Sequence, residues 1–217
     1  GLPFAYFPSQ ETKEEAGFII PNINESNKLG YSFQNGGYYL PISKYLDFTI
    51  LGDYYTNGSY GVNLSSQYKK RYKYTGNFSI RYENLINGER GLPDYSKSTI
   101  YNVRWTHSKD SKASPYSSLS ASVNFGSSDY FRQSVNQLNT PNFLNNNLSS
   151  SVSYTKTFPG DAGVRLSLTT SMSQNTQSKE VNLTLPTYTL NSSRFYPFSK
   201  KGGTKKGIIQ NINLQYS

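Results

Sequence analysis

The feature that most constrains this chain is an alternation of apolar and polar residues that recurs in segments of about ten residues. In residues 74–83, alternate positions hold Tyr, Gly, Phe, Ile and Tyr, whereas the positions between them hold Thr, Asn, Ser, Arg and Glu. The pattern returns in residues 98–106, 118–125 and 164–173, with Ile100 as an exception on the polar side. A period of two predicts β-strands with one apolar and one polar face. Strands of about 9–11 residues with this character suit a membrane-spanning β-barrel around a wet lumen.

The composition agrees with this all-β interpretation. Hydrophobic residues make up 35% of the 217 residues, yet the chain holds 20 Tyr and 12 Phe. Tyrosine suits a bilayer interface because its ring is buried while its hydroxyl stays in water, so a surplus is expected from the aromatic girdles of a barrel. We therefore predict an antiparallel transmembrane β-barrel. The alternative fold is a soluble, tyrosine-rich β-sandwich that binds carbohydrate or acts as an adhesin.

Turn-forming segments divide the chain into about eleven strands, of which the first is short and covers residues 17–23. The pair Asn57-Gly58 predicts a two-residue hairpin with a type I′ turn. The long connections 84–97 and 126–146 fall at one end of the sheet, which is the outer end if the first strand starts on the periplasmic side. The connection 191–205 is also long, but it falls at the inner end. Single-chain bacterial barrels have even strand numbers, so eleven strands predict a partial wall of a larger barrel.

The excess of basic over acidic residues narrows the classes of molecule that the chain can bind. The net charge is +9, and local clusters occur at residues 69–73 and 200–206. Such clusters fit anionic lipid, anionic glycolipid or nucleic acid, or simply a solvated surface. More informative are polar-face residues that fall on several different strands and would line the lumen together as a substrate path: Arg81, Arg104, Arg165, Asn77 and Asn102.

The chain offers little for catalysis, and we expect neither an enzyme nor a cofactor. It has no cysteine, and His107 is its single histidine. His107 follows Trp105 and is expected at the bilayer interface. Asp47 and Asp53 lie about 20 Å apart on one strand at ~3.4 Å per residue, too far for acid–base chemistry. No phosphate loop, zinc spacing or calcium loop occurs, and the basic and aromatic segment 68–74 is better explained as a hairpin connection than as a nucleic-acid site.

Several segments resemble a known family. The opening GLPFAYFP, the segment GFIIP at 17–21 and the glycine- and tyrosine-rich segment 30–41 are similar to the start of the barrel in lipopolysaccharide-assembly outer-membrane proteins, also called organic-solvent-tolerance proteins. The likeness continues through residues 47–49, 68–74, 105–107 and 195–198, so it covers nearly the whole chain. The Tyr-, Asn- and Lys-rich strands resemble the Bacteroidetes branch of that family.

The resemblance implies a transport function. Members of that family receive lipopolysaccharide from periplasmic bridge proteins, hold a plug lipoprotein inside the barrel, and release the lipid sideways into the outer leaflet of the Gram-negative outer membrane. It also implies that residues 1–16 are a linker from a periplasmic jelly-roll domain that precedes Gly1, and that 17–217 are the N-terminal part of the barrel. The disulfides that some members use are in doubt, because cysteine is absent. The alternative within transport is a porin or a plugged receptor.

The resemblance also implies a lateral gate near the first strand. Prolines near the start of the barrel weaken the seam between the first and last strands in this family, and Pro8 and Pro21 occupy matching positions. The physical argument agrees, because proline lacks the N–H that a ladder hydrogen bond requires. Any first strand can carry a proline, and Pro8 can lie in the linker, so Pro21 is the stronger candidate.

Overall fold

The computed structural model describes residues 15–26, 29–127, 129, 133, 147–159, 163–195 and 214–216, which form one antiparallel sheet. The strands are β1 (Gly17–Ile19), β2 (Asn22–Ser26), β3 (Gly30–Ser43), β4 (Leu46–Tyr55), β5 (Tyr60–Lys70), β6 (Tyr74–Asn87), β7 (Ser96–Lys109), β8 (Ser117–Gly126), β9 (Asn147–Phe158), β10 (Val164–Asn175), β11 (Glu180–Phe195) and β12 (Leu214–Tyr216). In the described part of the chain, no helix has the length and apolarity needed to span a membrane.

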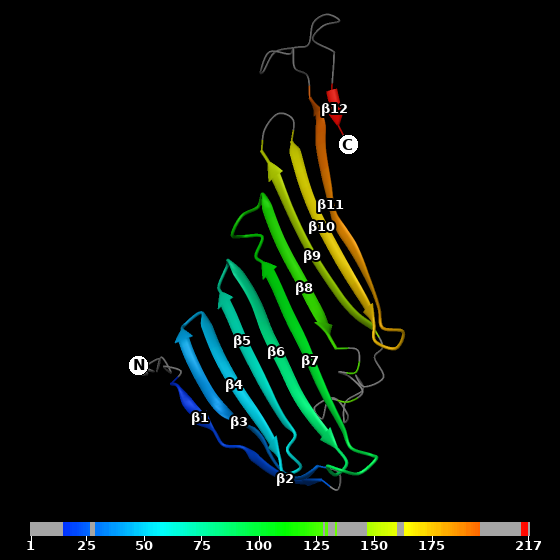
Figure 1. Cartoon of the computed structure of the whole chain (residues 1–217). Helices are drawn as coiled ribbons and strands as arrows, with labels where there is room; N and C mark the ends of the chain where they lie inside the picture. Colours follow the sequence, from blue (N-terminus) through cyan, green and yellow to red (C-terminus); the bar gives the residue numbers. More distant parts are fainter. Residues whose placement is uncertain are drawn as a thin grey trace, which may run out of the picture.

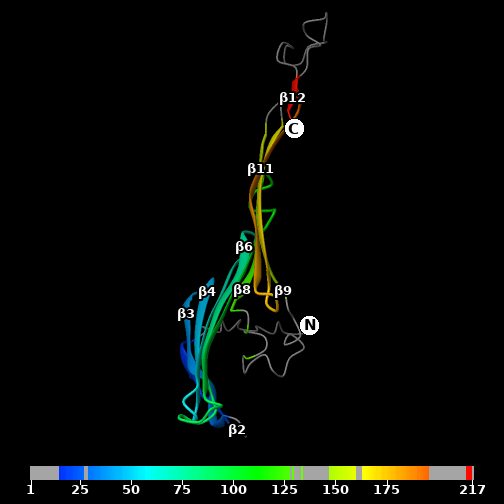
Figure 2. The same cartoon turned by 45° about the vertical axis from the view of Figure 1, so that its right-hand side comes forward.

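Each strand from β3 onward lies beside the next strand of the chain, as Figure 1 shows. Both β1 and β2 pair with β3, so together they make one edge, and β12 pairs with β11 at the other. Counting β1 and β2 as one interrupted strand gives eleven, which confirms the predicted number and the predicted open wall. Figure 2 shows the sheet nearly edge-on as a single curved layer. The sandwich alternative is therefore wrong, because a sandwich requires two packed sheets.

The connections fall alternately at two ends of the sheet. We call the end with the β3–β4, β5–β6 and β7–β8 connections the basic end, and the other the opposite end. The connection predicted for residues 84–97 is shorter than expected, because β6 and β7 stay paired as far as Asn87 and Ser96. Ile100, the exception to the alternation, is 1% exposed and clusters with the buried Leu85 and Leu148. This local apolar cluster explains why the hairpin extends beyond its expected end.

The predicted type I′ turn at Asn57-Gly58 is wrong. Gly58 has a positive φ of 91°, whereas Asn57 is not among the residues with positive φ. The Tyr55 N–H donates to Ser59 O at 2.9 Å, which closes a three-residue loop of the kind that ends in a left-handed residue. Asn57 is used differently: its side-chain amide donates to Ile86 O at 2.7 Å and so fixes the turn against β6.

The ladder confirms the two-faced pattern. One row of paired residues crosses the sheet as Tyr38, Ile50, Leu64, Ile80, Val103 and Phe125. The next row on the other face is Thr49, Ser65, Ser79, Arg104 and Asn124. We call these the apolar and polar faces. Leu166 and Leu168 share the apolar face and Arg165 the polar face through the pairing of β10 with β9.

Near the first edge of the sheet, the exposure of apolar and charged residues is inverted relative to a water-soluble protein. On the apolar face, Ile50 is 50% exposed, whereas Arg81 and Glu83 on the polar face are 5% and 1% exposed. Charged residues are almost never fully buried unless paired, and large exposed apolar areas mark an interaction surface. The apolar face therefore exposes large hydrophobic side chains, whereas the polar face combines a buried charged group around Arg81 with exposed residues such as Ser122 and Arg165.

Aromatic residues form two belts on the apolar face. Tyr60 and Tyr82 lie toward the opposite end with ring centroids 6.4 Å apart, and Tyr68 and Tyr74 lie toward the basic end at 6.0 Å. Eight residues separate the two belts along β5 and along β6, about 27 Å at ~3.4 Å per residue. Because barrel strands are tilted, this spacing fits the ~25 Å apolar band of an outer-membrane barrel.

Candidate gate and polar network

Pro21 lies where the first edge of the sheet is interrupted. β1 pairs with β3 up to Ile19↔Gly37, and β2 resumes at Asn22↔Gln34 in the same register, so Ile20 and Pro21 form a gap without a slip. In the described part of the chain, β1 and β2 pair with β3 alone. Proline cannot donate to a ladder and also biases the preceding residue. The gap therefore lies at the proline predicted for the gate, whereas Pro8 lies outside the described residues.

The backbone of β3 is irregular directly opposite this gap. Its register against β4 shifts between Phe33 and Gly36, and Asn35 adopts a left-handed φ of 59°. This is a β-bulge, which bends a strand and locally disrupts its ladder. Gly36 allows the Pro21 ring to approach, since a Cβ built on Gly36 would lie 2.8 Å from Pro21 Cβ. The gap at Pro21 and the bulge at Asn35 therefore lie opposite each other, where the first edge strand pairs with β3.

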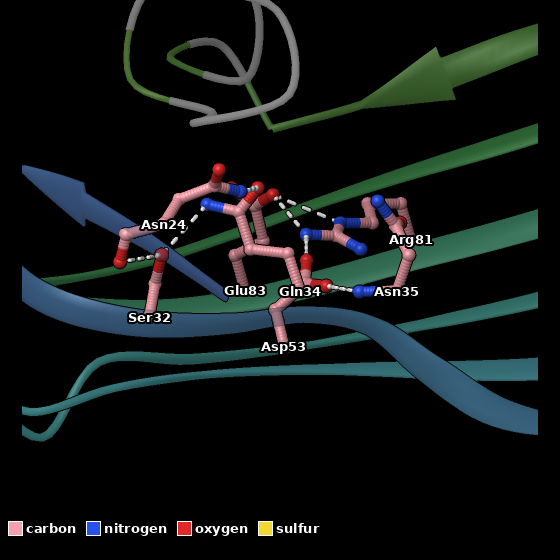
Figure 3. Close-up of polar contacts among 7 residues, drawn as sticks. All are labelled: Asn24, Ser32, Gln34, Asn35, Asp53, Arg81 and Glu83. Atoms are coloured by element: carbon pink, nitrogen blue, oxygen red, sulfur yellow. Dashed lines mark hydrogen bonds and ion pairs between the residues drawn. The ribbon is translucent and has the colours of Figure 1, made fainter. Parts of the chain in front are cut away.

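A buried carboxylate holds the bulge in place. The N–H of Asn35 donates to Asp53 Oδ1 at 2.7 Å, so the donor released by the bulge is satisfied by a side chain (Figure 3). The other oxygen of Asp53 accepts a hydrogen bond from Arg81. Arg81 also donates to Glu83 Oε1, at 2.8 Å from Nε and 2.7 Å from Nη2. One guanidinium thereby joins two carboxylates from β4 and β6 and, through Asp53, the bulge of β3.

A second set of polar contacts joins β3 to the edge strand β2. The hydroxyl of Ser32 donates to Asn24 O at 3.2 Å, and the amide of Gln34 donates to Ser32 Oγ at 3.2 Å. Figure 3 shows these side chains beside the Asp53 and Arg81 group. Two neighbouring sets of polar contacts therefore lie near the first edge, one between β2 and β3 and one from the bulge of β3 through Asp53 to Arg81 and Glu83 on β6.

The predicted lumen residues share the polar face but do not form one cluster. Arg81 pairs across the ladder with Asn102, and Arg104 pairs with Ser79, so the two arginines are diagonal neighbours. Arg165 is distant from both. The row Thr106, Ser122, Ser151 and Ser171 crosses from β7 to β10, and Arg104 and Arg165 lie on opposite sides of it. They are separated by about eight residues, roughly 27 Å along the strands.

The five predicted path residues also differ in their availability. Arg81 is held by its two carboxylates, and the buried Asn102 donates to Asn124 Oδ1 at 3.0 Å and to Phe125 O at 3.2 Å. Asn77 accepts a hydrogen bond from Thr106. Arg104 is half-buried and Arg165 exposed, and neither makes an ion pair among the described residues. Arg104 and Arg165 are therefore the arginines best able to meet an anionic group.

His107, the single histidine, belongs to a cluster of aromatic side chains. His107 Nδ1 lies 2.9 Å from Tyr68 Oη, and Trp105 Nε1 donates to the same hydroxyl at 2.8 Å, which places the histidine in an aromatic cluster on the apolar face. Within the described ranges, no group of three or more His, Asp or Glu side chains could hold a metal ion.

The sequence interpretation missed the bulge and the role of Asp53. The available signal was the run Asn35-Gly36-Gly37 inside an otherwise regular strand, since glycine in a strand often marks a bulge or a close approach. Asp53 lies on the polar face, but its partners lie 18 and 28 residues away in the chain.

The comparisons with known proteins agree with this geometry. The family model described as LptD protein matches residues 1–217, which is the whole chain. No protein with a curated description matches the chain.

Proposed function

Since the chain belongs to the LptD protein family, which supports a role in lipopolysaccharide transport and assembly at the outer membrane, we propose that it forms part of a conduit that inserts lipopolysaccharide into the outer leaflet. The observation that carries this proposal is the two-faced sheet, which exposes large hydrophobic residues such as Ile50 and Leu183 on one face and carries polar residues, including the buried Arg81 and Glu83, on the other. An apolar outer face and a polar inner face are the requirements of a membrane barrel. A porin or plugged receptor shares this wall, but the family match favours lipopolysaccharide transport.

In this proposal, residues 17–217 form the N-terminal part of the wall and 1–16 a linker from a jelly-roll domain. A plug lipoprotein occupies the lumen, periplasmic bridge proteins deliver the substrate, and outer-membrane lipids surround the apolar face. The chain transports its substrate without chemical change.

The lumen path is proposed to use Arg104 and Arg165. Arginine binds phosphate oxygens through a bidentate fork, and lipopolysaccharide carries anionic groups. We expect Arg104→Gln/Arg165→Gln to slow export several-fold while the barrel stays folded, measured as lipopolysaccharide arrival at the cell surface after a pulse. Lys97→Gln/Lys179→Gln at the opposite end is the matched control. If photo-crosslinking of lipopolysaccharide to the lumen wall is unchanged in the arginine variant, Arg104 and Arg165 only balance charge and do not contact the substrate.

The gate is proposed to open at Pro21. The proline gap, the bulge at Asn35 and the close approach at Gly36 support an irregular first strand, which offers an incomplete ladder to a last strand across the seam. An edge with a lost ladder donor is weaker by about 1 kcal/mol, the net value of one hydrogen bond. Pro21→Ala should strengthen the seam by that amount and reduce lateral release.

Cells that carry Pro21→Ala should accumulate lipopolysaccharide on the barrel and become permeable to large antibiotics. Pro186→Ala, a proline exchange in β11 far from the first edge, is the control and should leave both readouts unchanged. If Pro21→Ala has no effect while Pro8→Ala impairs export and the permeability barrier, the hinge lies in the linker and the gate is misplaced.

A further inference from the structure

We propose that the basic end of the sheet and the apolar groove next to it form a binding site for an anionic phospholipid of the surrounding leaflet. This inference rests on the membrane placement proposed above. It concerns the outer, lipid-facing surface of the wall, away from the lumen and the gate.

Cations gather at the basic end of the described chain. They come from three successive connections and the strand ends beside them: Lys44, Lys69, Lys70, Arg71, Lys73 and Lys112. None of them makes an ion pair among the described residues. The nearby acid Asp110 accepts a hydrogen bond from the Lys112 N–H at 2.8 Å. These connections lie at the upper ends of β3 to β8 in Figure 1.

The positive groups are gathered around aromatic rings. The ammonium groups of Lys44 and Lys70 lie 5.2 and 5.0 Å from the centre of the Tyr45 ring. Arg71 and Lys112 lie 5.3 and 5.4 Å from the centre of the Tyr72 ring. Each ring thus has two like charges beside it, an arrangement that a shared anion would stabilise. A phosphate satisfies several such donors at once through charge-assisted hydrogen bonds.

The turn that carries Tyr72 adopts an unfavourable backbone conformation. Tyr72 has a left-handed φ of 61°, a region that bulky residues rarely adopt and that favours glycine or asparagine. Its side chain is 55% exposed, so burial does not offset this cost within the described chain. Residues held in such rarely populated backbone conformations concentrate at functional sites, and this supports a ligand at the Tyr72 turn.

An apolar groove continues from these cations toward the middle of the sheet. It has a volume of ≈ 470 Å³ and is lined by Tyr68, Phe78, Val103, Trp105, Val123 and Phe125. All six belong to the apolar face, and Tyr68 lies two residues, or ~7 Å, from Lys70 along β5. Tyr68 leans across Gly76 and is held by Trp105 and His107 through its hydroxyl.

The cations, the Tyr68 layer and the apolar groove follow one another along the sheet in the same order as the phosphate, glycerol and acyl groups of a phospholipid. The phosphate lies among Lys44, Lys70 and Arg71, the glycerol region meets the amphipathic Tyr68 layer, and an acyl chain occupies the groove. Aromatic belts at headgroup depth and polybasic segments that attract anionic lipids both act at such an interface. The opposite end mixes both signs, with Glu89, Arg90 and Asp94 in its β6–β7 connection, and is not suited to the same ligand.

The test uses the full-length protein reconstituted in phosphatidylethanolamine membranes that contain a trace of phosphatidylglycerol or phosphatidylcholine with a photoreactive acyl chain. Crosslinked peptides are then identified by mass spectrometry. We expect the phosphatidylglycerol probe to label the peptides that contain Phe78 and Val123 at least fivefold more than the phosphatidylcholine probe. One lysine near an anionic surface contributes about 1 kcal/mol, which corresponds to about fivefold at 25 °C.

Lys44→Gln/Lys70→Gln should bring the two probes to equal labelling, whereas Lys44→Arg/Lys70→Arg should retain the preference. Lys97→Gln/Lys179→Gln, the same exchange at the opposite end, is the matched control and should also retain it. Equal labelling by both probes in the unmodified protein, or an unchanged preference in the glutamine variant, would overturn the site while leaving the membrane placement intact. Absence of labelling by either probe would overturn the membrane placement itself.

Discussion

Replacing Arg81 by glutamine should destabilise the wall by about 3–5 kcal/mol, the cost of removing one partner from a buried ion pair. Arg81 is 5% exposed and holds Asp53 and Glu83, which are 4% and 1% exposed. Without the guanidinium, two carboxylates face each other in an enclosed place, and Asp53 must still accept the bulge N–H of Asn35. The free energy of unfolding in urea, measured in detergent micelles or lipid bilayers, gives the size of the effect.

Arg104→Gln is the matched control, because Arg104 lies on the neighbouring strand, on the same face, and makes no ion pair among the described residues. Arg104→Gln should lower the free energy of unfolding much less than Arg81→Gln does. Arg81→Gln combined with Asp53→Asn and Glu83→Gln should recover much of the lost stability, since neutral partners no longer repel. Equal losses for Arg81→Gln and Arg104→Gln would show that the Arg81 network contributes little. For this reason the export experiment changes only Arg104 and Arg165. Changing Arg81 as well would destabilise the wall, and a folding defect would obscure the effect on export.

A lysine at Val123 should destabilise the membrane-inserted protein by about 2–4 kcal/mol, the cost of a cation near the middle of a barrel's lipid-facing band. Val123 pairs with Trp105 on the apolar face, in the same row as Phe78, which lies midway between the two aromatic belts. Hydrocarbon cannot solvate the ammonium group, and the side chain is too deep for its charge to reach water easily. Folding yield and the unfolding free energy in lipid vesicles measure the loss.

Ser122→Lys provides a control at almost the same depth, because Ser122 is the exposed neighbour of Val123 on the polar face. This variant should fold nearly as well as the unmodified chain, since the new charge enters a wet lumen. Similar losses for both variants would indicate that neither face contacts lipid and would contradict the membrane wall. A larger loss for Ser122→Lys would mean that the two faces are assigned in reverse.

Much of the fold could be predicted because its signals are local. The alternation around Ile80 and Val103 placed both on one face, and the ladder pairs them directly. The strand number followed from turn-forming segments, and both aromatic belts followed from the tyrosine content. The predictions failed where neighbours in space decide the outcome, as at Asn57-Gly58, where contact with Ile86 accompanies a three-residue loop instead of a type I′ turn.

The candidate site was only partly predictable. Pro21 was identified from the family resemblance, and the structure shows an interruption of the first strand there. The bulge at Asn35 and its carboxylate partner were not identified, because their contact joins β3 to β4 through a side chain. Arg165 was grouped with Arg81 and Arg104 because all three occupy polar positions, yet the register of β7 to β10 separates it from them.

The sequence by itself therefore determined which residues share a face, how many strands form and where the chain turns, because a period of two is a property of each strand alone. The tertiary structure decided which polar groups meet. Whether Arg81 faces Asp53, and how far Arg104 lies from Arg165, depends on the register and stagger between strands. A shift of one residue in that register would exchange the faces, and the pattern along any single strand would look the same.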